Sequence, residues 1–339
     1  MPGVVTMSNM ALSSQSPAPP AARSSRVPDF FIVGHHKSGT TALYEMLRVH
    51  PQIFLPALKE PRYLASDMRS RFRYAREPRH PETMDEYLAL FDDASTGQRV
   101  GEASATYLWS HTAAERIAEL RPDAQVIAIL REPASFLRSL HLTFVRGHVE
   151  SQTNFAKALA LEERRREGKS IPRRSHLPQL LQYSDHVRYA DQLRRYRDRF
   201  PAEQMLVLIY DDFLADNDGT VRAAHRFLGV EERPVEEVAV NVTKRYVRSQ
   251  QVDDLVFSVT MGKGALSKSA KTAIKAVSPK RLRHRVMHTI RRRVVLADAP
   301  PEDELLMLEL RRRFKDEVIA VSEFLGRDLV ALWGYDKLD

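Results

Sequence analysis

Three short apolar runs stand out along the chain, at residues 30–33, 125–130 and 205–209. Each is almost continuously apolar, which is typical of a strand that is buried on both faces of a sheet. The segments between them carry apolar residues at helical spacing, such as Leu43 and Met46 after the first run. This alternation predicts an α/β fold with a central parallel sheet, flanked by helices on both faces.

The segments that directly follow predicted strands are expected to meet in space. In a parallel sheet the carboxyl ends of the strands share one edge, and ligands bind in the crevice outside that edge. We therefore expect residues 34–41, 102–107, 131–139 and 210–213 to converge on one site.

The two ends of the chain differ in composition. Residues 1–27 are rich in Ser, Pro and Ala and nearly free of large apolar residues. Such a segment cannot bury enough surface to offset its ordering entropy, which predicts a disordered tail. Residues 28–339 are predicted to form a single domain, with a core at 28–250 and one amphipathic C-terminal helix within 301–339.

A basic zone of about residues 251–300 separates that core from that helix. No acidic residue occurs between Asp254 and Asp298, whereas Lys and Arg recur there. Two interpretations of residues 255–297 stay open: a lid or acceptor-docking surface for an anionic or lipid-like substrate, and a plain solvated helical face. The net charge of +8 favours anionic ligands, although solubility alone accounts for it equally well.

Composition excludes several kinds of chemistry. The chain has no cysteine, which rules out disulfides, thiol catalysis and Cys-based zinc sites. No apolar stretch approaches the roughly 18–20 residues of a membrane span. The N-terminus lacks the compact apolar core of a signal peptide, so a cytoplasmic location is expected.

The turn after the first apolar run has the spacing of a phosphate-binding loop. It is bounded by Gly34 and Gly39, and a strand–turn–helix of this kind points backbone N–H groups at a phosphate. An ATP or GTP loop, GxxxxGK[ST], has its lysine directly after the second glycine. Here Thr40 stands at that position, and the lysine is Lys37, inside the loop. The displaced lysine indicates that a group other than a terminal phosphate is transferred.

A second motif follows the second apolar run. Ser139 comes eight positions after Arg131, about two turns into a helix that Pro133 opens. This spacing allows both side chains to face one phosphate, and the forked guanidinium suits that role. Alone, Arg-x-Pro is also the ordinary start of a helix after a strand. Together with the displaced-lysine loop it is specific.

With these two motifs the sequence resembles the PAPS-dependent sulfotransferases, where PAPS is 3′-phosphoadenosine 5′-phosphosulfate. The 5′-phosphosulfate loop of that family is similar to residues 37–41, and its 3′-phosphate motif to Arg131…Ser139. Other segments are similar to the bacterial and carbohydrate (heparan-type) branch: Lys59-Glu60-Pro61, residues 101–108, residues 189–213, Phe227-Leu228-Gly229 and residues 324–333.

The resemblance implies that PAPS is the co-substrate and gives each matching residue a role. Lys37 is implied to face the bridging oxygen of the sulfate leaving group. The other nucleotide-binding residues are Ser38, Gly39, Thr40 and Thr41 for the 5′-phosphate, Arg131 and Ser139 for the 3′-phosphate, and Lys244 and Arg245 in a basic loop over it. For the last two, ordinary surface charge is an equal alternative. No metal is expected, because no magnesium-bridged pair of phosphates has to be neutralised.

The acceptor hydroxyl needs a general base. In heparan-type enzymes a glutamate serves, and the resemblance places it at Glu60, with Arg62 where that family has a histidine. The alternative is that Glu60 merely pairs with Lys59 or Arg62. Glu102 is the second candidate, although a structural carboxylate is its more common role.

Histidines are weaker candidates. The cytosolic-type enzymes have their catalytic histidine where this chain has Leu142, and His141 lies one position early. His35 and His36 are adjacent and point in different directions, so we interpret them as loop histidines that contact sulfate or solvent rather than as metal ligands.

The sequence therefore predicts a sulfotransferase that acts on a hydroxyl of a carbohydrate, glycolipid or secondary metabolite, with no nucleic-acid partner. A P-loop kinase or NTPase is the second hypothesis, and its magnesium ligand would be Asp211 or Asp212. A third is a basic protein that binds nucleic acid or a membrane through residues 255–297.

Overall fold

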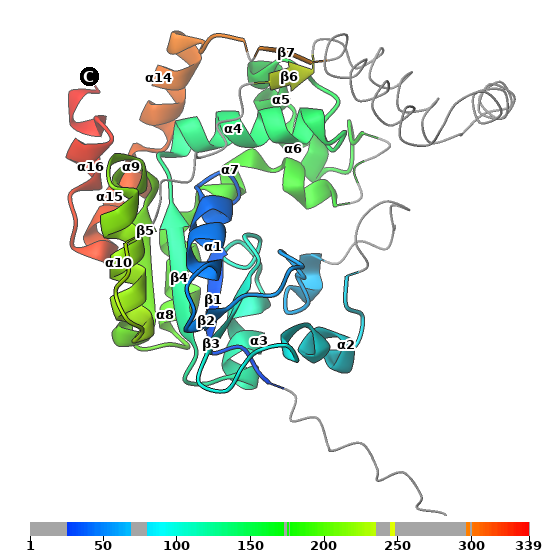
Figure 1. Cartoon of the computed structure of the whole chain (residues 1–339). Coiled ribbons are helices and arrows are strands. Elements are labelled where there is room, and N and C mark those ends of the chain that lie inside the picture. The colour runs from blue at the N-terminus through cyan, green and yellow to red at the C-terminus, as the bar shows by residue number, and fades with distance from the viewer. Residues whose placement is uncertain are drawn as a thin grey trace, which may run out of the picture.

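The computed structural model describes residues 26–68, 80–172, 175, 177–234, 245–247, 296–298 and 300–338. Five parallel strands form a central sheet in the order β2-β3-β1-β4-β5 (Figure 1). They are β1 (Phe30–Gly34), β2 (Ile53–Phe54), β3 (Arg99–Ala103), β4 (Gln125–Leu130) and β5 (Met205–Ile209). The α/β prediction is confirmed, and the three apolar runs are β1, β4 and β5.

Helices follow most of the strands and lie on both sides of the sheet (Figure 1). After β1, β3, β4 and β5 come α1 (Thr40–Arg48), α3 (Ala113–Leu120), α4 (Pro133–Arg146) and α9 (Tyr210–Ala215), and α10 (Asn217–Leu228) follows α9. In the described part of the chain, the other helices before the C-terminal region are α2 (Met84–Leu88), α5 (Phe155–Ala160), α6 (Glu162–Arg166), α7 (Tyr183–His186) and α8 (Tyr189–Arg197). Short 3-10 turns lie at Ser66–Met68, Ala89–Phe91, Pro178–Leu181, Ala202–Gln204 and Tyr335–Lys337.

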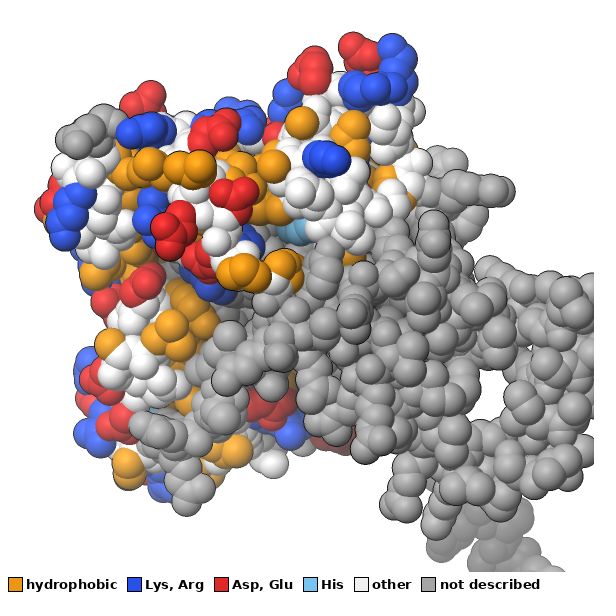
Figure 2. All heavy atoms as spheres, turned by 90° about the horizontal axis from the view of Figure 1, so that it is seen from above, with side chains coloured by type: hydrophobic (Ala, Val, Ile, Leu, Met, Phe, Trp, Pro, Cys, Tyr) orange, Lys and Arg blue, Asp and Glu red, His pale blue; other side chains and the backbone are white. Residues whose placement is uncertain are grey.

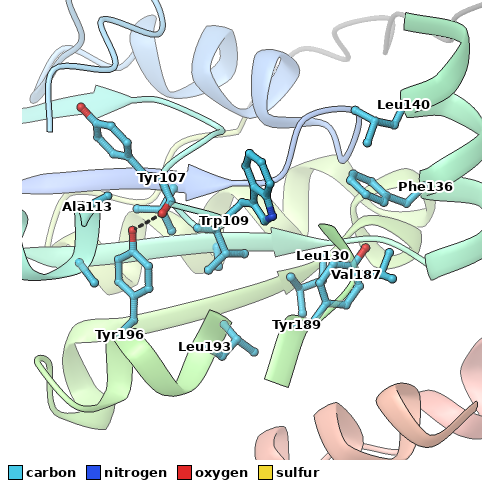
Figure 3. Packing of buried hydrophobic residues seen from close by; sticks show 14 of the residues in the cluster. Tyr107, Trp109, Ala113, Leu130, Phe136, Leu140, Val187, Tyr189, Leu193 and Tyr196 are labelled. Atoms are coloured by element: carbon cyan, nitrogen blue, oxygen red, sulfur yellow. Dashed lines mark hydrogen bonds between the residues drawn. The ribbon is translucent and has the colours of Figure 1, made fainter. Parts of the chain in front are cut away.

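Side chains of β1 alternate between the two faces of the sheet. Phe30 and Ile32 pack with α1 and α10 on one face, whereas Phe31 and Val33 pack with α3, α8 and the C-terminal helices on the other. On the second face, shown in Figure 3, the Tyr196 hydroxyl of α8 donates to the carbonyl of Tyr107 at 2.9 Å. Burial on both faces is the reason that the strands read as continuous apolar runs.

The C-terminal region is not the single amphipathic helix predicted within 301–339. It forms α14 (Glu304–Arg313), α15 (Lys315–Leu325) and α16 (Leu329–Leu332). Gly326 ends α15 in a left-handed conformation with φ 60°, and the Asp328 side chain caps α16. The spacing of apolar residues continues across these helix ends, so that spacing alone does not reveal where one helix stops and the next begins.

Residues 1–25 of the predicted tail and most of the basic zone lie outside the described residues. Two short strands at the ends of that zone, β6 (Arg245–Val247) and β7 (Leu296–Asp298), pair antiparallel, and β6 lies against α4 (Figure 1). Among the helices that the structure describes, none combines the length and apolar character needed to cross a bilayer.

Candidate functional site

The loop between β1 and α1 lies at the carboxyl edge of the sheet. Gly39 caps α1 with φ 91°, and a Cβ there would lie 3.0 Å from a ring carbon of Phe213 and 3.2 Å from one of Tyr210. Both the left-handed backbone and the close packing require glycine. Lys37 is also left-handed, with φ 65°. Two such residues directly before a helix N-terminus form the kind of backbone concavity that binds anions.

The hydroxyl side chains of this loop differ in exposure. Ser38 and Thr40 are buried, and Thr41 is exposed. The Ser38 Oγ atom has no hydrogen-bond partner among the described residues. A buried hydroxyl without a partner is unfavourable unless a ligand supplies one. The loop therefore fits a bound 5′-phosphate oxygen at this position.

Arg131 joins the two predicted motifs. It directly follows β4, the neighbour of β1, and its Nη1 donates to the carbonyl of Lys37 at 3.1 Å. Its guanidinium carbon lies 4.8 Å from the centre of the Tyr210 ring, and its own carbonyl accepts from the Tyr189 hydroxyl at 3.0 Å. The loop, the Arg-x-Pro segment and the start of α9 thus meet at one point, as the topology predicted.

Helix α4 carries the rest of the predicted 3′-phosphate motif. The Glu132 carboxylate caps this helix, accepting from the N–H groups of Ala134 at 3.0 Å and Ser135 at 2.7 Å. Ser139 is buried on α4. Arg245 begins β6, which lies against the same helix, whereas Lys244 lies outside the described residues.

Positive charge gathers around Lys37. Burial, the charge of Arg146 and the charge of Arg131 together lower the pKa of its ammonium group. Arg146 was not among the predicted site residues. The sequence held a signal for it, because it lies seven positions after Ser139 and a helix brings that spacing to one face. Such a cluster of cations suits a ligand with several negative charges.

The Glu60 carboxylate lies among three nitrogen-bearing side chains. Its Oε1 is 3.1 Å from Lys59 Nζ and 3.7 Å from His36 Nδ1, and its Oε2 is 2.5 Å from Arg62 Nη2. Burial alone would raise the pKa of Glu60, but His36, Lys59 and Arg62 outweigh it and lower that pKa below its ordinary value. Both pairings named as the alternative role of Glu60 are present. The carboxylate is ionised, and His36 places it beside the β1–α1 loop.

The backbone around Glu60 is attached to the end of β3. The Glu60 N–H donates to the Ala103 carbonyl at 2.9 Å, and the Arg62 N–H donates to Ser104 Oγ at 3.0 Å. Glu60 and Arg62 both have positive φ, 60° and 55°. Such conformations cost on the order of 1–3 kcal/mol each and gather at functional sites.

Glu102, the second candidate base, lies inside the protein at the end of β3. It has no exposed surface and accepts a hydrogen bond from the Tyr87 hydroxyl at 3.0 Å. Burial raises the pKa of its carboxyl to about 7. A side chain without exposed surface cannot meet an acceptor, so this geometry agrees with a structural carboxylate.

The histidines of the loop are not equivalent. His35 is buried with Nε2 2.6 Å from Gln192 Oε1, and burial lowers its pKa to about 3. The prediction that His35 contacts sulfate or solvent is therefore wrong, because it packs inward against Phe136 and Tyr189. His36 stays partly exposed, and burial lowers its pKa to about 4, so it is neutral at physiological pH. Within the described ranges no three His, Asp or Glu side chains are grouped as metal ligands.

The two aspartates that a kinase would use for magnesium are engaged elsewhere. Asp211 Oδ2 accepts from Trp333 Nε1 at 2.9 Å. Asp212 accepts from both Nη atoms of Arg327, at 2.5 and 2.7 Å. These contacts fix the C-terminal region and leave the kinase hypothesis without its proposed ligands.

The face of the molecule above the carboxyl ends of the strands is not uniformly basic over its described part. Figure 2 views the molecule from this side, and over the described part acidic, basic and apolar side chains are interleaved. The basic zone 255–297, on which the nucleic-acid or membrane hypothesis depends, lies almost entirely outside the described residues.

Residues 28–234 match the profile of the Sulfotransferase family, so the chain belongs to that family. It is similar to human carbohydrate sulfotransferase 15, with 31% identity over 158 residues, which covers 35% of this chain and 27% of that protein. It is also similar to human bifunctional heparan sulfate N-deacetylase/N-sulfotransferase 3, with 28% identity over 211 residues, or 60% of this chain and 22% of that protein.

A solved structure supports the same conclusion. A sulfotransferase from Alicyclobacillus acidocaldarius aligns with a TM-score of 0.64 and 26% identity, covering 91% of this chain and 99% of that one. The chain spans only about a quarter of the length of the two human relatives. The family and the fold predicted from the two motifs are confirmed.

Proposed function

We propose that this protein transfers the sulfuryl group of PAPS to a hydroxyl group of an acceptor. The observation that carries the proposal is the hydrogen bond from Arg131 to the carbonyl of Lys37. It places a guanidinium suited to a 3′-phosphate directly beside a loop suited to a 5′-phosphosulfate. A nucleotide with phosphates on both sides of its ribose matches that pair of groups, whereas ADP and ATP lack the 3′-phosphate.

The residues of the β1–α1 loop fit the phosphosulfate end. The buried Ser38 hydroxyl has a free hydrogen bond to offer, and Gly39 leaves the backbone N–H groups uncovered at the start of α1. Thr40 and Thr41 follow at the start of α1, and their hydroxyl groups assist in binding the same phosphate. On the other side, Arg131 and Ser139 receive the 3′-phosphate, and the strand that begins at Arg245 lies next to α4.

Lys37 acts on the leaving group. The acceptor oxygen attacks sulfur in line, the bond from sulfur to the bridging oxygen breaks, and that oxygen keeps the electron pair. The Lys37 ammonium stabilises the charge that develops there, in a site where a fixed charge is worth more than in water. Burial, with the charges of Arg146 and Arg131, lowers the pKa of Lys37, which makes its proton easier to share.

Glu60 takes the proton of the acceptor hydroxyl. In the described geometry its oxygens are held by Lys59 and Arg62, so one of these contacts has to give way to the acceptor. Arg62 is 41% exposed, and an ion pair this open to water contributes roughly 0–1 kcal/mol. Replacing this contact with the acceptor therefore costs little free energy.

The acceptor class is proposed to be a carbohydrate. The two human relatives are named as a carbohydrate sulfotransferase and a heparan sulfate N-sulfotransferase. The cations Lys59, Arg62 and Arg146 around Glu60 and Lys37 also suit a polar, hydrogen-bonding acceptor. Glycolipids and secondary metabolites are the alternatives.

The test is a transfer assay with sulfur-labelled PAPS and a panel of carbohydrate, glycolipid and small-molecule hydroxyl acceptors. We expect label on at least one carbohydrate and an equal amount of released adenosine 3′,5′-bisphosphate, with neither product from Lys37→Ala. Magnesium-dependent ATP hydrolysis without sulfuryl transfer would contradict the proposal and support the kinase or NTPase hypothesis.

A further inference from the structure

The C-terminal helices hold the neighbours of Arg131. The Tyr335 hydroxyl donates to Glu132 Oε1 at 2.7 Å, and both residues are buried. Glu132 is the residue directly after Arg131 and caps α4. Burial raises the pKa of Tyr335, so its hydroxyl stays protonated and remains a donor. Tyr335 thus fixes the turn in which β4 becomes α4.

A second link reaches Arg131 through the ring on which it lies. The guanidinium lies over Tyr210, the first residue of α9. The next two residues of α9 are held by the C-terminal region, Asp211 by the Trp333 indole N–H and Asp212 by Arg327. The orientation of the Tyr210 ring therefore depends on the residues just after α15 and α16.

A third link passes through α8. The Glu317 carboxylate of α15 accepts from the N–H of Ala190 at 2.7 Å, in the first turn of α8. The preceding residue, Tyr189, donates its hydroxyl to the carbonyl of Arg131. Helix α14 meanwhile packs alongside α4 at the same edge of the sheet (Figure 1).

We propose that the C-terminal region, through Tyr335, Trp333 and Arg327, positions the guanidinium of Arg131 and thereby sets the affinity for the 3′-phosphate of the nucleotide. All three residues lie beyond residue 234, where the match to the family profile ends. They touch no reacting atom and are positioning residues. The inference rests on the proposed function, because it presupposes a ligand with a 3′-phosphate.

The physical reason is the entropy of a long side chain. An arginine that rotates freely loses that freedom when it binds an anion, which lowers affinity. An arginine whose backbone is fixed on both sides, and whose guanidinium already lies on a fixed ring, loses less. Loosening the supports should therefore weaken binding of the 3′-phosphate and leave the 5′-phosphate loop unaffected.

The test compares two nucleotides in calorimetric titrations of the full chain. Adenosine 3′,5′-bisphosphate carries the 3′-phosphate and adenosine 5′-phosphate lacks it, so the ratio of their affinities reports the 3′ site alone. For Tyr335→Phe we expect this ratio to fall about tenfold, because a hydrogen bond to a charged group is lost beside Arg131. The affinity for adenosine 5′-phosphate should stay within about twofold.

Tyr183→Phe is the matched control. Its hydroxyl also donates to a buried carboxylate, Glu150, at 3.1 Å, and this carboxylate pairs with Arg165 instead of capping the helix that follows Arg131. We expect both variants to lose similar stability and only Tyr335→Phe to lose discrimination. A Tyr335→Phe protein that is destabilised like the control but keeps the wild-type ratio overturns the inference.

Arg327→Gln keeps the inference testable where Tyr335→Phe does not fold. This arginine is 41% exposed, so its loss is less damaging to the core, and a fall of about threefold in the same ratio is expected. An unchanged ratio overturns the inference here too. A wild-type protein that binds both nucleotides equally contradicts the proposed function itself, which separates the two failures.

Discussion

The two halves of the candidate site are built in different ways. On the nucleotide side, Arg131 lies between strands and helices and is held through Lys37, Tyr189 and Tyr210. On the acceptor side, Glu60 lies in an irregular segment with positive φ and is held by the side chains of Lys59 and Arg62.

The subsite around Arg131 is therefore preformed, whereas the contacts around Glu60 can be exchanged for contacts with a ligand. The supports of Arg131 are backbone groups and buried rings, which a ligand does not displace. The contacts of Glu60 are charge pairs with a partly exposed arginine, which an acceptor can replace. We therefore expect the nucleotide side to determine binding and the acceptor side to determine turnover.

Removing the lysine of the loop should have the largest effect. In Lys37→Ala, we expect kcat to fall about a thousandfold, because the charge on the leaving oxygen loses its stabilising donor. The affinity for adenosine 3′,5′-bisphosphate should change by about threefold at most, since Arg131 and the loop backbone remain. Stopped or quenched turnover assays and calorimetry measure the two quantities separately. An unchanged kcat would remove Lys37 from the chemistry.

Neutralising the proposed base should have the next largest effect. For Glu60→Gln we expect kcat to fall about a hundredfold while nucleotide affinity is kept, because general base catalysis typically contributes that much or more. Glu102→Gln serves as the control and should retain most of the turnover, since that carboxylate has no exposed surface. Full turnover in Glu60→Gln would show that another group takes the proton.

A methyl group at the loop glycine tests whether the nucleotide side is rigid. Gly39→Ala forces a left-handed alanine and brings its Cβ within 3.0 Å of Phe213. We expect the free energy of unfolding to fall by about 1–3 kcal/mol, measured by urea titration. Gly97→Ala is a matched control, because its φ is also positive but nothing lies within 4 Å of its Cβ position. Equal losses would mean that packing at the loop contributes nothing.

The smallest effect is expected from loosening the acceptor side. The pKa of Glu60 is lowered in the folded protein, so the carboxylate stays ionised as the pH falls below the ordinary glutamate value of about 4.3. Arg62→Gln removes one of the charges responsible, so the acid limb of the kcat/KM profile should move to higher pH. The stabilising contribution of these ion pairs is present above that ordinary value and is lost as the pH falls. A limb that does not move would argue that Glu60 is not the titrating group.

The position of Arg131 beside the β1–α1 loop depends on strand order, whereas the surroundings of Glu60 depend on an irregular segment. Lys37 and Gly39 lie in the loop after β1 and Arg131 directly follows β4, so the neighbouring positions of these two strands bring them together. Lys59 and Arg62 were named as possible partners of Glu60, but His36 was not. Glu60 lies in a segment without regular structure. Its left-handed backbone at Glu60 and Arg62 leaves no mark in the pattern of apolar residues.

Contacts between residues that are far apart in the sequence could not be predicted from the sequence. Trp333 and Tyr335 meet Asp211 and Glu132 across separations of 122 and 203 residues, which no local pattern encodes. The inward orientation of the His35 side chain toward Gln192 also could not be predicted, because it depends on where α8 packs.

Calorimetric titration of the wild-type protein with adenosine 3′,5′-bisphosphate and with ADP tests the central claim most directly. If Arg131 and the loop together read a nucleotide that carries phosphates on both sides of its ribose, the bisphosphate should bind at least about tenfold more tightly than ADP. Equal affinity for ADP would contradict the account.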